Sequence, residues 1–277
     1  MKENIAIQGG LGSFHEAAAK SYFNQEHHLV ECETFGELIR AVKSGKAKKG
    51  VMAIENSVAG SILPNYARIQ ESGLKITGEV FLRIHQHLMA LPGETLQSIN
   101  EVNSHPMAIL QCEAFFKDHP HMRLVEKPDT ALSAKAIAQR KLLNRAAIAS
   151  EGASQLYGLE IIAREIETNK RNYTRFLIIE TESNLQPDCQ KASLCFQAKH
   201  EPGSLAKILS AMAENDINMT KIQSLPVVGQ EFTYLFHCDL IGKNRTHLEQ
   251  VFKKIDKLCL NMEILGVYKL GSHNTIN

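Results

Sequence analysis

The chain has 277 residues, 44% of them hydrophobic and 22% charged, which is typical of a globular protein long enough for two domains. Its 31 basic and 30 acidic residues leave a net charge of +1, so no global field favours nucleic acid or a membrane surface as a partner. No window reaches the ~18 apolar residues of a membrane span, and no signal peptide is recognisable. The six cysteines form no CxxC pair and lie in apolar runs, as buried free thiols do. We therefore expect a cytoplasmic protein.

The first 76 residues alternate short apolar runs with helical patterns. Residues 4–8 predict a strand that leads into GGLG, and Ser13 then opens a helix with capping-box spacing to Glu16. A second strand and helix follow over 29–45, and KKGVMAI (48–54) predicts a third strand. Strands that alternate with helices predict a parallel α/β sheet, and such sheets bind ligands at the carboxyl ends of their strands.

A second set of strand and helix units follows from about residue 76. ITGEVFLRIHQHLMALP (76–92) predicts a long β segment, and IIAREI and TRFLIIE predict strands that return to the first lobe. We therefore predict a catalytic domain over 1–181, with lobe 1 over 1–76 and 160–181 and lobe 2 over 77–159. Two crossings between lobes predict a hinged cleft, a place for a small ligand.

A second domain is predicted after a polar segment, 182–192, which contains Pro187 and shows no periodicity, so that we interpret it as a linker. The domain covers 193–271. Its expected elements are a strand (193–199), a helix (203–215), two strands (218–226 and 231–241), a helix (244–260) and a strand (262–270). This βαββαβ order predicts a ferredoxin-like fold with a four-stranded antiparallel sheet.

Two segments of the first domain gather polar groups at strand ends. The GGLG turn with Ser13 offers free N–H groups to an anion, although such turns are also common tight connections. Glu55, Asn56 and Ser57 end the third predicted strand, where they form a ligand site or merely cap the next helix. Either interpretation fits these residues taken alone.

Arg175 lies between a hydroxyl, Thr174, and an aromatic ring, Phe176, at the start of an apolar strand. A lone arginine at a strand edge is usually a solvated surface group. In a cleft, its planar fork would bind both oxygens of a carboxylate.

His85 and His87 alternate along a predicted strand, so both rings would point to one face, as a metal pair requires. No third ligand stands at a suggestive spacing. We predict no metal site.

Taken together, these motifs resemble the prephenate dehydratases. The matching runs stand in that family's order and spacing: Gly9 to Phe14, GVMAIENSVAGS, His105-Pro106 with Gln111-Cys112, Ala149 to Glu151, Leu156 to Leu159, and Asn172 to Phe176. The Glu-Asn-Ser and Thr-Arg-Phe motifs, found in one chain, are specific to the family. The tail is similar to ACT regulatory domains in Glu201 to Leu205 and Ile217 to Ile222. The resemblance covers nearly the whole chain.

The resemblance implies a two-lobed, periplasmic-binding-protein-like catalytic domain followed by an ACT domain. It implies the decarboxylating dehydration of prephenate to phenylpyruvate, CO2 and water, with no cofactor. By resemblance Thr174 donates to the departing hydroxyl, Arg175 grips a carboxylate and Phe176 packs behind it. By the same resemblance, Ser13, Asn56 and Ser57 supply neutral donors to the substrate, and Glu55 orients Asn56 or Arg175. Thr130 places a hydroxyl across the cleft.

Members of this family bind phenylalanine as a feedback inhibitor at a dimer interface of the ACT domain. The turn at Gly203, Ser204 and Leu205 suits capture of an amino-acid carboxylate by backbone N–H groups, and Asn218 would reach the ammonium or carboxylate. Where the family commonly has Glu-Ser-Arg-Pro, this chain has Gln223-Ser224-Leu225-Pro226, so one acid and one base are missing. We expect phenylalanine as effector, altered charge coupling between subunits, and a homodimer or homotetramer.

Two other functions remain open at this point. Arogenate dehydratase performs the same elimination on a substrate with an amino group in place of the keto oxygen, and no residue here decides between the two. A non-catalytic amino-acid-binding sensor would also combine hinged lobes with an ACT tail. The intact Thr174-Arg175 pair favours an enzyme.

Overall fold

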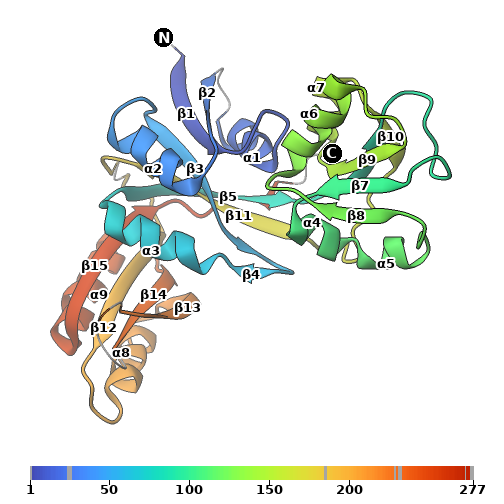
Figure 1. Ribbon diagram of the computed structural model, residues 1–277. Helices are drawn as coiled ribbons and strands as arrows, with labels where there is room; N and C mark the ends of the chain where they lie inside the picture. Colours follow the sequence, from blue (N-terminus) through green and yellow to red (C-terminus); the bar gives the residue numbers. More distant parts are fainter. Residues whose placement is uncertain are drawn as a thin grey trace. The chain divides into compact units, whose positions relative to one another are not determined.

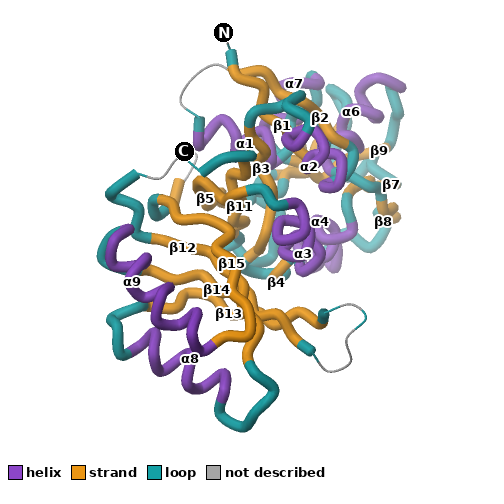
Figure 2. Tube along the Cα trace, turned by 90° about the vertical axis from the view of Figure 1, so that its left-hand side faces the viewer, coloured by secondary structure: helices purple, strands orange, loops and turns teal. Residues whose placement is uncertain are grey.

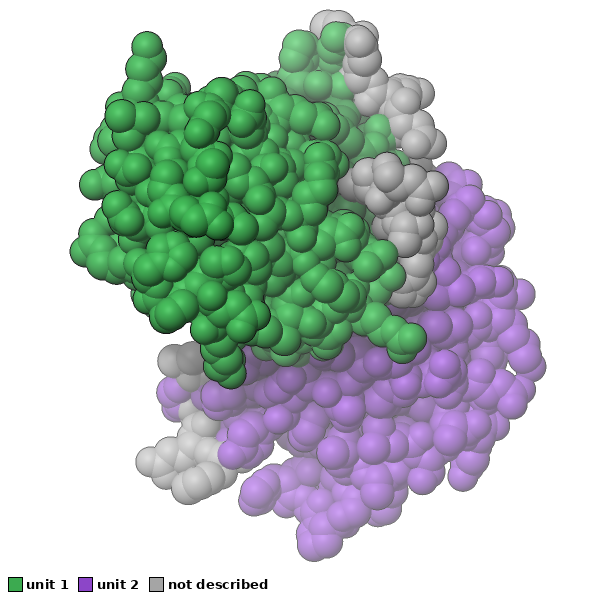
Figure 3. Space-filling view, turned by 90° about the vertical axis from the view of Figure 1, so that its right-hand side faces the viewer, with its two compact units in different colours: residues 1–62, 80–176, 273–277 green, residues 63–79, 177–272 purple. Residues whose placement is uncertain are grey.

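The computed structural model describes residues 2–23, 27–183, 186–227, 229, 233–271 and 273–274. It divides into two compact units, of which unit 1 comprises residues 1–62, 80–176 and 273–277, and unit 2 comprises 63–79 and 177–272 (Figure 3). Two strands, β5 (Lys75–Arg83) and β11 (Tyr173–Glu180), run through both units. Within the described residues, no helix has the length and apolar character needed to cross a membrane.

The first sheet follows the order β16-β5-β11-β3-β1-β2, and β4 pairs with β3 (Figure 1). Its other strands are β1 (Glu3–Gln8), β2 (His27–Cys32), β3 (Lys49–Asn56), β4 (Gly60–Ser61) and β16 (His273–Asn274). β1 runs parallel to both β2 and β3, which confirms the predicted parallel α/β arrangement. β3 is apolar over most of its length because it lies in the interior of the sheet.

The helices α1 (Phe14–Tyr22) and α2 (Phe35–Lys43) pack against this sheet and begin at the predicted places. Ser13 caps α1 by accepting the Glu16 N–H at 3.3 Å, and Glu16 in turn accepts the Gly12 N–H. The capping box was therefore predicted correctly at Ser13, but its return bond reaches one residue further back than the usual box.

The second sheet lies in unit 1 and follows the order β10-β6-β9-β7-β8. Its strands are β6 (His87–Ala90), β7 (Glu101–Ser104), β8 (Arg123–Glu126), β9 (Arg145–Ala149) and β10 (Glu160–Ala163). Its helices are α4 (Pro106–Gln111), α5 (Glu113–Lys117), α6 (Thr130–Arg140) and α7 (Glu151–Tyr157). Figure 1 shows α4 and α5 on one face and α6 and α7 on the other.

Apolar side chains on both faces of the strands explain why helices cover the sheet on both sides. Leu88 and Ile148 pack in one buried cluster with Phe116 of α5, whereas Met89 and Ala147 pack in another with α6. Because neighbouring residues of a strand point to opposite faces, strands that are apolar at every position require helices on both sides.

Two predictions about the lobes are wrong in detail. The long β segment is broken at residues 84–86, so that β5 belongs to the first sheet and β6 to the second. β10 does not return to the first sheet but pairs antiparallel with β6. A strand's own pattern shows that it will pair, but not with which neighbour. The domain boundaries themselves remain a prediction.

Unit 2 contains a four-stranded antiparallel sheet with the order β13-β14-β12-β15. The strands and helices of this unit are α3 (Leu63–Ser72), β12 (Lys191–Ala198), α8 (Ser204–Ala213), β13 (Asn218–Pro226), β14 (Tyr234–Ile241), α9 (Arg245–Ile255), a 3-10 turn (Asp256–Leu258) and β15 (Cys259–Tyr268), together with the parts of β5 and β11 named above. The predicted βαββαβ order is confirmed. Residues 184–185 of the predicted linker and 231–232 of a predicted strand lie outside the described residues.

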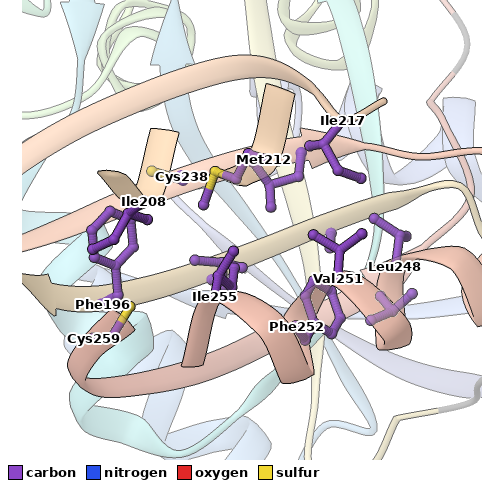
Figure 4. Close-up of a cluster of buried hydrophobic side chains, with 14 of the residues drawn as sticks. Phe196, Ile208, Met212, Ile217, Cys238, Leu248, Val251, Phe252, Ile255 and Cys259 are labelled. Carbon is purple, nitrogen blue, oxygen red and sulfur yellow. The ribbon is translucent and has the colours of Figure 1, made fainter. Parts of the chain in front are cut away.

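The helices α8 and α9 lie side by side against one face of this sheet (Figure 2). Between them and the strands is a buried apolar cluster that includes Phe196, Ile208, Val251 and Phe252 (Figure 4). Burial of such side chains is worth about 1.5–3 kcal/mol each, so this cluster stabilises the unit.

Residues 63–79 pack against the same sheet through different contacts. The Tyr66 ring meets the His237 ring edge-on at 5.5 Å, and Gln70 donates to Glu263 at 3.3 Å. At Gly266 a Cβ atom would stand 2.0 Å from the carbonyl oxygen of Ile76, so only glycine allows this approach.

All six cysteines are free and buried, as predicted.

Candidate active site

A cavity of about 380 Å³ in unit 1 brings together elements that are far apart in the sequence. Its polar lining consists of Gln8, Ser13, His15, Asn56, Gln86, His105, Gln111, Asp129, Thr130 and Thr174. Phe14, Phe35, Ile84 and Phe176 are among its apolar lining residues. Its volume suits a small molecule, and an apolar cavity with a few fixed polar groups is the usual form of such a site.

The hydroxyl of Thr174 is oriented by Asn56. The Asn56 Nδ2 amide donates to Thr174 Oγ1 at 3.0 Å and to the Asn172 side-chain oxygen at 2.7 Å. Since the Thr174 oxygen thus accepts a hydrogen bond, its own proton remains available to donate. Within the described part of the chain, no protein group accepts that proton.

Asn56 is itself held by its position at the end of β3. Its Oδ1 accepts the backbone N–H groups of Val58 and Ala59 at 2.9 and 2.8 Å. This is a local turn that asparagine favours after a strand, and it turns the Nδ2 group toward β11.

Two glutamines extend the network of side-chain amides. Gln111 accepts from Asn172 at 3.0 Å and from Gln86 at 3.2 Å, and it donates to Asn56 at 3.4 Å. Gln86 is buried, and its Oε1 has no hydrogen-bond partner among the described residues although the side chain lines the cavity. An unsatisfied acceptor at this place suits a hydroxyl group of a bound ligand.

The cavity's lining in the described chain includes no lysine or arginine. Its histidines are uncharged at neutral pH, since burial lowers the pKa of His15 to about 3 and also lowers the pKa of His105. Burial raises the pKa of Asp129, although backbone N–H groups of Leu132 and Ala131 oppose the shift. An anion here would be held by neutral donors and by the N-terminus of α1, where Ser13 lines the cavity. At the N-terminus of α6 the Asp129 carboxyl already accepts the Leu132 N–H, so the Thr130 hydroxyl is the donor that remains there.

The loop between β1 and α1 is held closely by α7. Ser150 donates to the Gly12 carbonyl at 2.5 Å, and the Tyr157 hydroxyl donates to the Leu11 carbonyl at 2.8 Å. A Cβ atom on Gly12, whose φ is +81°, would stand 2.8 Å from the Ala153 backbone. Glycine is required there both by its backbone conformation and by this close approach.

Five of the predicted substrate-site residues line one cavity: Ser13, Asn56, Thr130, Thr174 and Phe176. They come from α1, β3, α6 and β11. The ring of Phe176 also meets the His15 ring edge-on at 5.0 Å.

Three predicted residues, Glu55, Ser57 and Arg175, are absent from the described lining of the cavity. Arg175 is buried, but it lies between Thr174 and Phe176 on β11, so its side chain leaves the opposite face of the strand. Glu55 stands in the same relation to Asn56 on β3. The predicted direct grip of Arg175 on a substrate carboxylate therefore has no support from this geometry.

Ser57 has a structural connection instead. Its hydroxyl donates to the Arg171 carbonyl at 3.0 Å and accepts the Tyr173 N–H at 2.9 Å. It ties the end of β3 to the start of β11.

A second cavity, of about 740 Å³, lies in unit 2 beside the first turn of α8. Gly203, Ser204 and Leu205 line it, together with Tyr234, Phe236 and Leu260, among others. Gly203 precedes α8 with a φ of +80° and no side-chain cap, so the first N–H groups of the helix have no side-chain acceptor there. The predicted effector residues Asn218, Gln223 and Ser224 lie on β13 and are absent from the described lining.

Sequence reasoning missed His15, Gln86, Gln111 and Asn172. Amide side chains carry no chemical signature in a sequence, and these come from separate loops and helices. The one clue in the sequence was that Gln111 and Asn172 belong to two of the runs that resemble the family, Gln111-Cys112 and Asn172 to Phe176.

Comparison with known proteins gives consistent results. Residues 5–184 match the family model described as prephenate dehydratase. A relative from Arabidopsis thaliana named arogenate dehydratase/prephenate dehydratase 2, chloroplastic, is 35% identical over 283 residues, covering 97% of this chain and 73% of the relative.

Two solved structures are similar over almost the whole chain. A prephenate dehydratase from Arthrobacter aurescens in complex with L-Phe aligns with a TM-score of 0.87 and 25% identity, over 96% of this chain and 90% of that one. A chain described as a novel type of quorum quenching acylase aligns with a TM-score of 0.86 and 31% identity, over 96% and 97%. The family match covers well over half of the chain, and relatives above 30% identity span nearly all of it. The chain therefore belongs to the prephenate dehydratase family and is a lyase.

Proposed function

We propose that the chain converts prephenate to phenylpyruvate, CO2 and water as a step of phenylalanine biosynthesis. The observation that carries this proposal is the Thr174 hydroxyl, which lines the cavity with its oxygen already accepting from Asn56. A hydroxyl held in this way offers its proton to a leaving group rather than taking one up.

The reaction requires the protein to orient the substrate and to supply one hydrogen-bond donor to the departing oxygen. The bond between the ring and its carboxylate breaks, its electron pair enters the ring, and the ring C–O bond breaks to release hydroxide. The ring becomes aromatic, which drives the step. Thr174 supports the departing oxygen with a hydrogen bond, and assistance of this kind is typically worth ~10²–10⁴-fold in rate.

Neutral donors bind the two carboxylates of prephenate in this proposal. The Ser13 hydroxyl and the first N–H groups of α1 supply donors, and the Thr130 hydroxyl at the start of α6 supplies another. Helix N-termini stabilise anions without adding a mobile charge. In this proposal the side chains of Arg175 and Glu55 leave the opposite faces of β11 and β3 and help to position Thr174 and Asn56.

The direct test is an ultraviolet assay for phenylpyruvate with Thr174→Ala and Thr174→Ser. We expect the alanine variant to lose ~10²–10⁴-fold in kcat, while serine, which keeps the hydroxyl, stays within about tenfold of the wild type. Circular dichroism checks that both variants are folded. Wild-type kcat in a folded Thr174→Ala variant would refute the role of the hydroxyl.

Arogenate is the second candidate substrate, because a relative at 35% identity is named for both dehydratase activities. The two substrates differ only where an amino group replaces the keto oxygen. The described lining of the cavity contains no lysine or arginine, so no basic side chain repels the amino group of arogenate, and Asp129 is its one acidic side chain. The ratio of kcat/KM on prephenate and arogenate decides, and we expect it to favour prephenate.

Acyl hydrolysis, which is named for one similar structure, is less well supported. An activated hydroxyl nucleophile needs a hydrogen-bonded base. Among the described residues, none of the cavity hydroxyls of Ser13, Thr130 and Thr174 is hydrogen-bonded to a histidine.

For the βαββαβ domain over 193–271 we propose the role of an ACT domain that binds L-phenylalanine and inhibits the enzyme. The unit 2 cavity supports this, since uncapped N–H groups suit a carboxylate and Tyr234, Phe236 and Leu260 suit an aromatic side chain. A similar structure was solved with L-Phe. Titration calorimetry with L-phenylalanine tests it, and absence of heat would refute it.

Two broader proposals follow from the same assignment. We place the enzyme in the cytoplasm. The exposed edge strand β13, whose residues alternate between exposed and half-buried, offers a pairing surface for a homodimer or homotetramer. Analytical ultracentrifugation measures the oligomeric state.

A further inference from the structure

Three ligand-type atoms meet in unit 1 at a place that the dehydratase chemistry does not use. His85 Nδ1 lies 3.5 Å from Glu165 Oε1 and 3.5 Å from Glu167 Oε1, and the three atoms lie within 4.8 Å of one another. His85 stands between β5 and β6, and the two glutamates follow β10. His87, which the sequence paired with His85, is not part of this cluster; the two glutamates take its place beside His85.

Two of these atoms are buried without a hydrogen bond. Glu167 is only 1% exposed, and neither its Oε1 nor His85 Nδ1 has a hydrogen-bond partner among the described residues. The other Glu167 oxygen accepts the Gln86 N–H at 2.9 Å, which holds the carboxylate in place. A buried carboxylate oxygen and a buried imidazole nitrogen, left unpaired side by side, call for a cation between them.

The distances favour a metal ion over a proton. A protonated His85 would donate from Nδ1 to one carboxylate at ~2.7–2.9 Å, whereas both oxygens stand equally far away at 3.5 Å. Ligand atoms bound to Zn²⁺ at ~2.0–2.2 Å in tetrahedral geometry are separated by ~3.4 Å. Both distances from His85 Nδ1 are close to this separation.

We propose that His85, Glu165 and Glu167 bind a divalent transition-metal ion, with Zn²⁺ as the first candidate. One imidazole nitrogen and two carboxylate oxygens suit Zn²⁺ and its neighbours better than Mg²⁺ or Ca²⁺, which prefer oxygen alone. Glu165 is half-exposed, so water completes the coordination from its side.

Surrounding groups orient the ligands as outer-shell residues do at metal sites. His87 Nδ1 accepts the Glu165 N–H at 3.2 Å, and the two histidine rings stack at 6.2 Å. Glu167 holds the backbone of Gln86, whose side chain joins the amide network of the substrate cavity. The ion is therefore structural: it stiffens the segment that carries Gln86 and does not touch the substrate.

The test is zinc binding by the full chain, after treatment with a chelator and dialysis. Equilibrium dialysis against ZnCl2 with elemental analysis is expected to give one tightly held zinc per chain and a rise in Tm. Glu167→Gln keeps the acceptor for Gln86 but removes the charge, and it should weaken zinc binding by at least ~100-fold. Glu165→Gln, at a half-exposed side chain, should weaken binding by a similar factor with little risk to folding.

Matched controls separate this site from adventitious binding at other histidines and acids. His121→Asn and Glu113→Gln change exposed residues outside the cluster and should leave zinc affinity and the Tm rise unchanged. Absence of zinc binding in the wild type would overturn the proposal, as would equal affinity in Glu165→Gln and Glu167→Gln. These readouts do not depend on dehydratase activity, so they succeed or fail independently of the proposed reaction.

Discussion

A single side-chain amide decides what the Thr174 hydroxyl can do. Asn56 Nδ2 donates to it at 3.0 Å, and the Asn56 oxygen is already taken by the Val58 and Ala59 N–H groups. In the proposed reaction this weak acid would need its proton free for the substrate. The Asn56 Nδ2 group can only donate to the hydroxyl, so it does not compete for that proton.

Asn56→Asp reverses this relation and provides a sharp prediction. A carboxylate cannot donate, so the Thr174 proton would turn toward it and away from the leaving hydroxyl. We expect kcat on prephenate to fall ~10²-fold, at the lower end of what loss of acid assistance costs. Steady-state kinetics at neutral pH measure this, with a thermal melt as the check on folding. Unchanged kcat would mean that Asn56 does not orient the hydroxyl.

His237 makes a prediction for stability rather than catalysis. It is buried, neither ring nitrogen has a hydrogen-bond partner among the described residues, and burial lowers its pKa to about 4 despite Asp239. The unfolded chain takes up a proton near pH 6.5 and the folded chain does not. Stability is therefore complete above about pH 6.5 and is lost as the pH falls toward 4.

Replacing His237 with phenylalanine removes this pH dependence. Between pH 7 and pH 4.5 the histidine should cost the wild type about 2–3 kcal/mol of unfolding free energy that the variant does not lose. Urea unfolding at the two pH values gives the difference. Equal losses in the wild type and His237→Phe would show that this ring is protonated in both states.

At the residue scale, five of the eight residues that the motifs predicted for the substrate site lie in the described lining of one cavity, but the motifs did not show which way their neighbours face. Ser13, Asn56, Thr130, Thr174 and Phe176 line the cavity as their motifs indicated. Arg175 does not, although the period of two along a strand already implied that neighbours of Thr174 leave the other face. The amides of the network were not predictable, because their hydrogen bonds join residues 25 to 118 positions apart.

At the scale of elements, helix starts were predictable because their caps are local. Ser13, Thr34 and Asn244 each accept an N–H from the first turn of the helix that follows. Strand pairing was not, as β10 shows, since it depends on a partner about seventy residues away. The same limit applies to the buried ion pair that joins β5 to β12 within unit 2.

This pair, Lys191 and Glu79, is almost fully buried. The Lys191 ammonium donates to both carboxylate oxygens at 2.9 and 2.7 Å, and the Gly271 N–H donates to one of them at 3.1 Å. We expect Lys191→Met to destabilise the protein by about 3–5 kcal/mol, because it leaves a charge buried without its partner. The double variant with Glu79→Gln should recover most of this loss.

Lys269→Met is the matched control for that experiment. Its ion pair with Asp188 is exposed to solvent, so its loss should leave the unfolding free energy almost unchanged. Chemical denaturation compares the four proteins. A cost for Lys191→Met no larger than that of Lys269→Met would contradict the importance of the buried pair.

At the scale of the whole molecule, each unit has its own cavity and two strands belong to both units. Thr174 and Phe176 lie in the part of β11 that belongs to unit 1, and the same strand continues into unit 2. Inhibition by phenylalanine, as proposed above, would require a coupling between the unit 2 cavity and the substrate site. Such a coupling between binding sites is reciprocal.

Reciprocity gives the last prediction. If phenylalanine weakens prephenate binding by some factor, prephenate must weaken phenylalanine binding by the same factor, typically ~5–150-fold. Thr174→Ala allows the measurement, because it should bind prephenate without turning it over. Calorimetry of that variant gives the Kd of phenylalanine with and without saturating prephenate, and the Kd of prephenate with and without phenylalanine. Ala206→Phe, which fills the lined unit 2 cavity, should abolish both effects together. If both effects persisted undiminished in Ala206→Phe, the effector site proposed in unit 2 would be excluded.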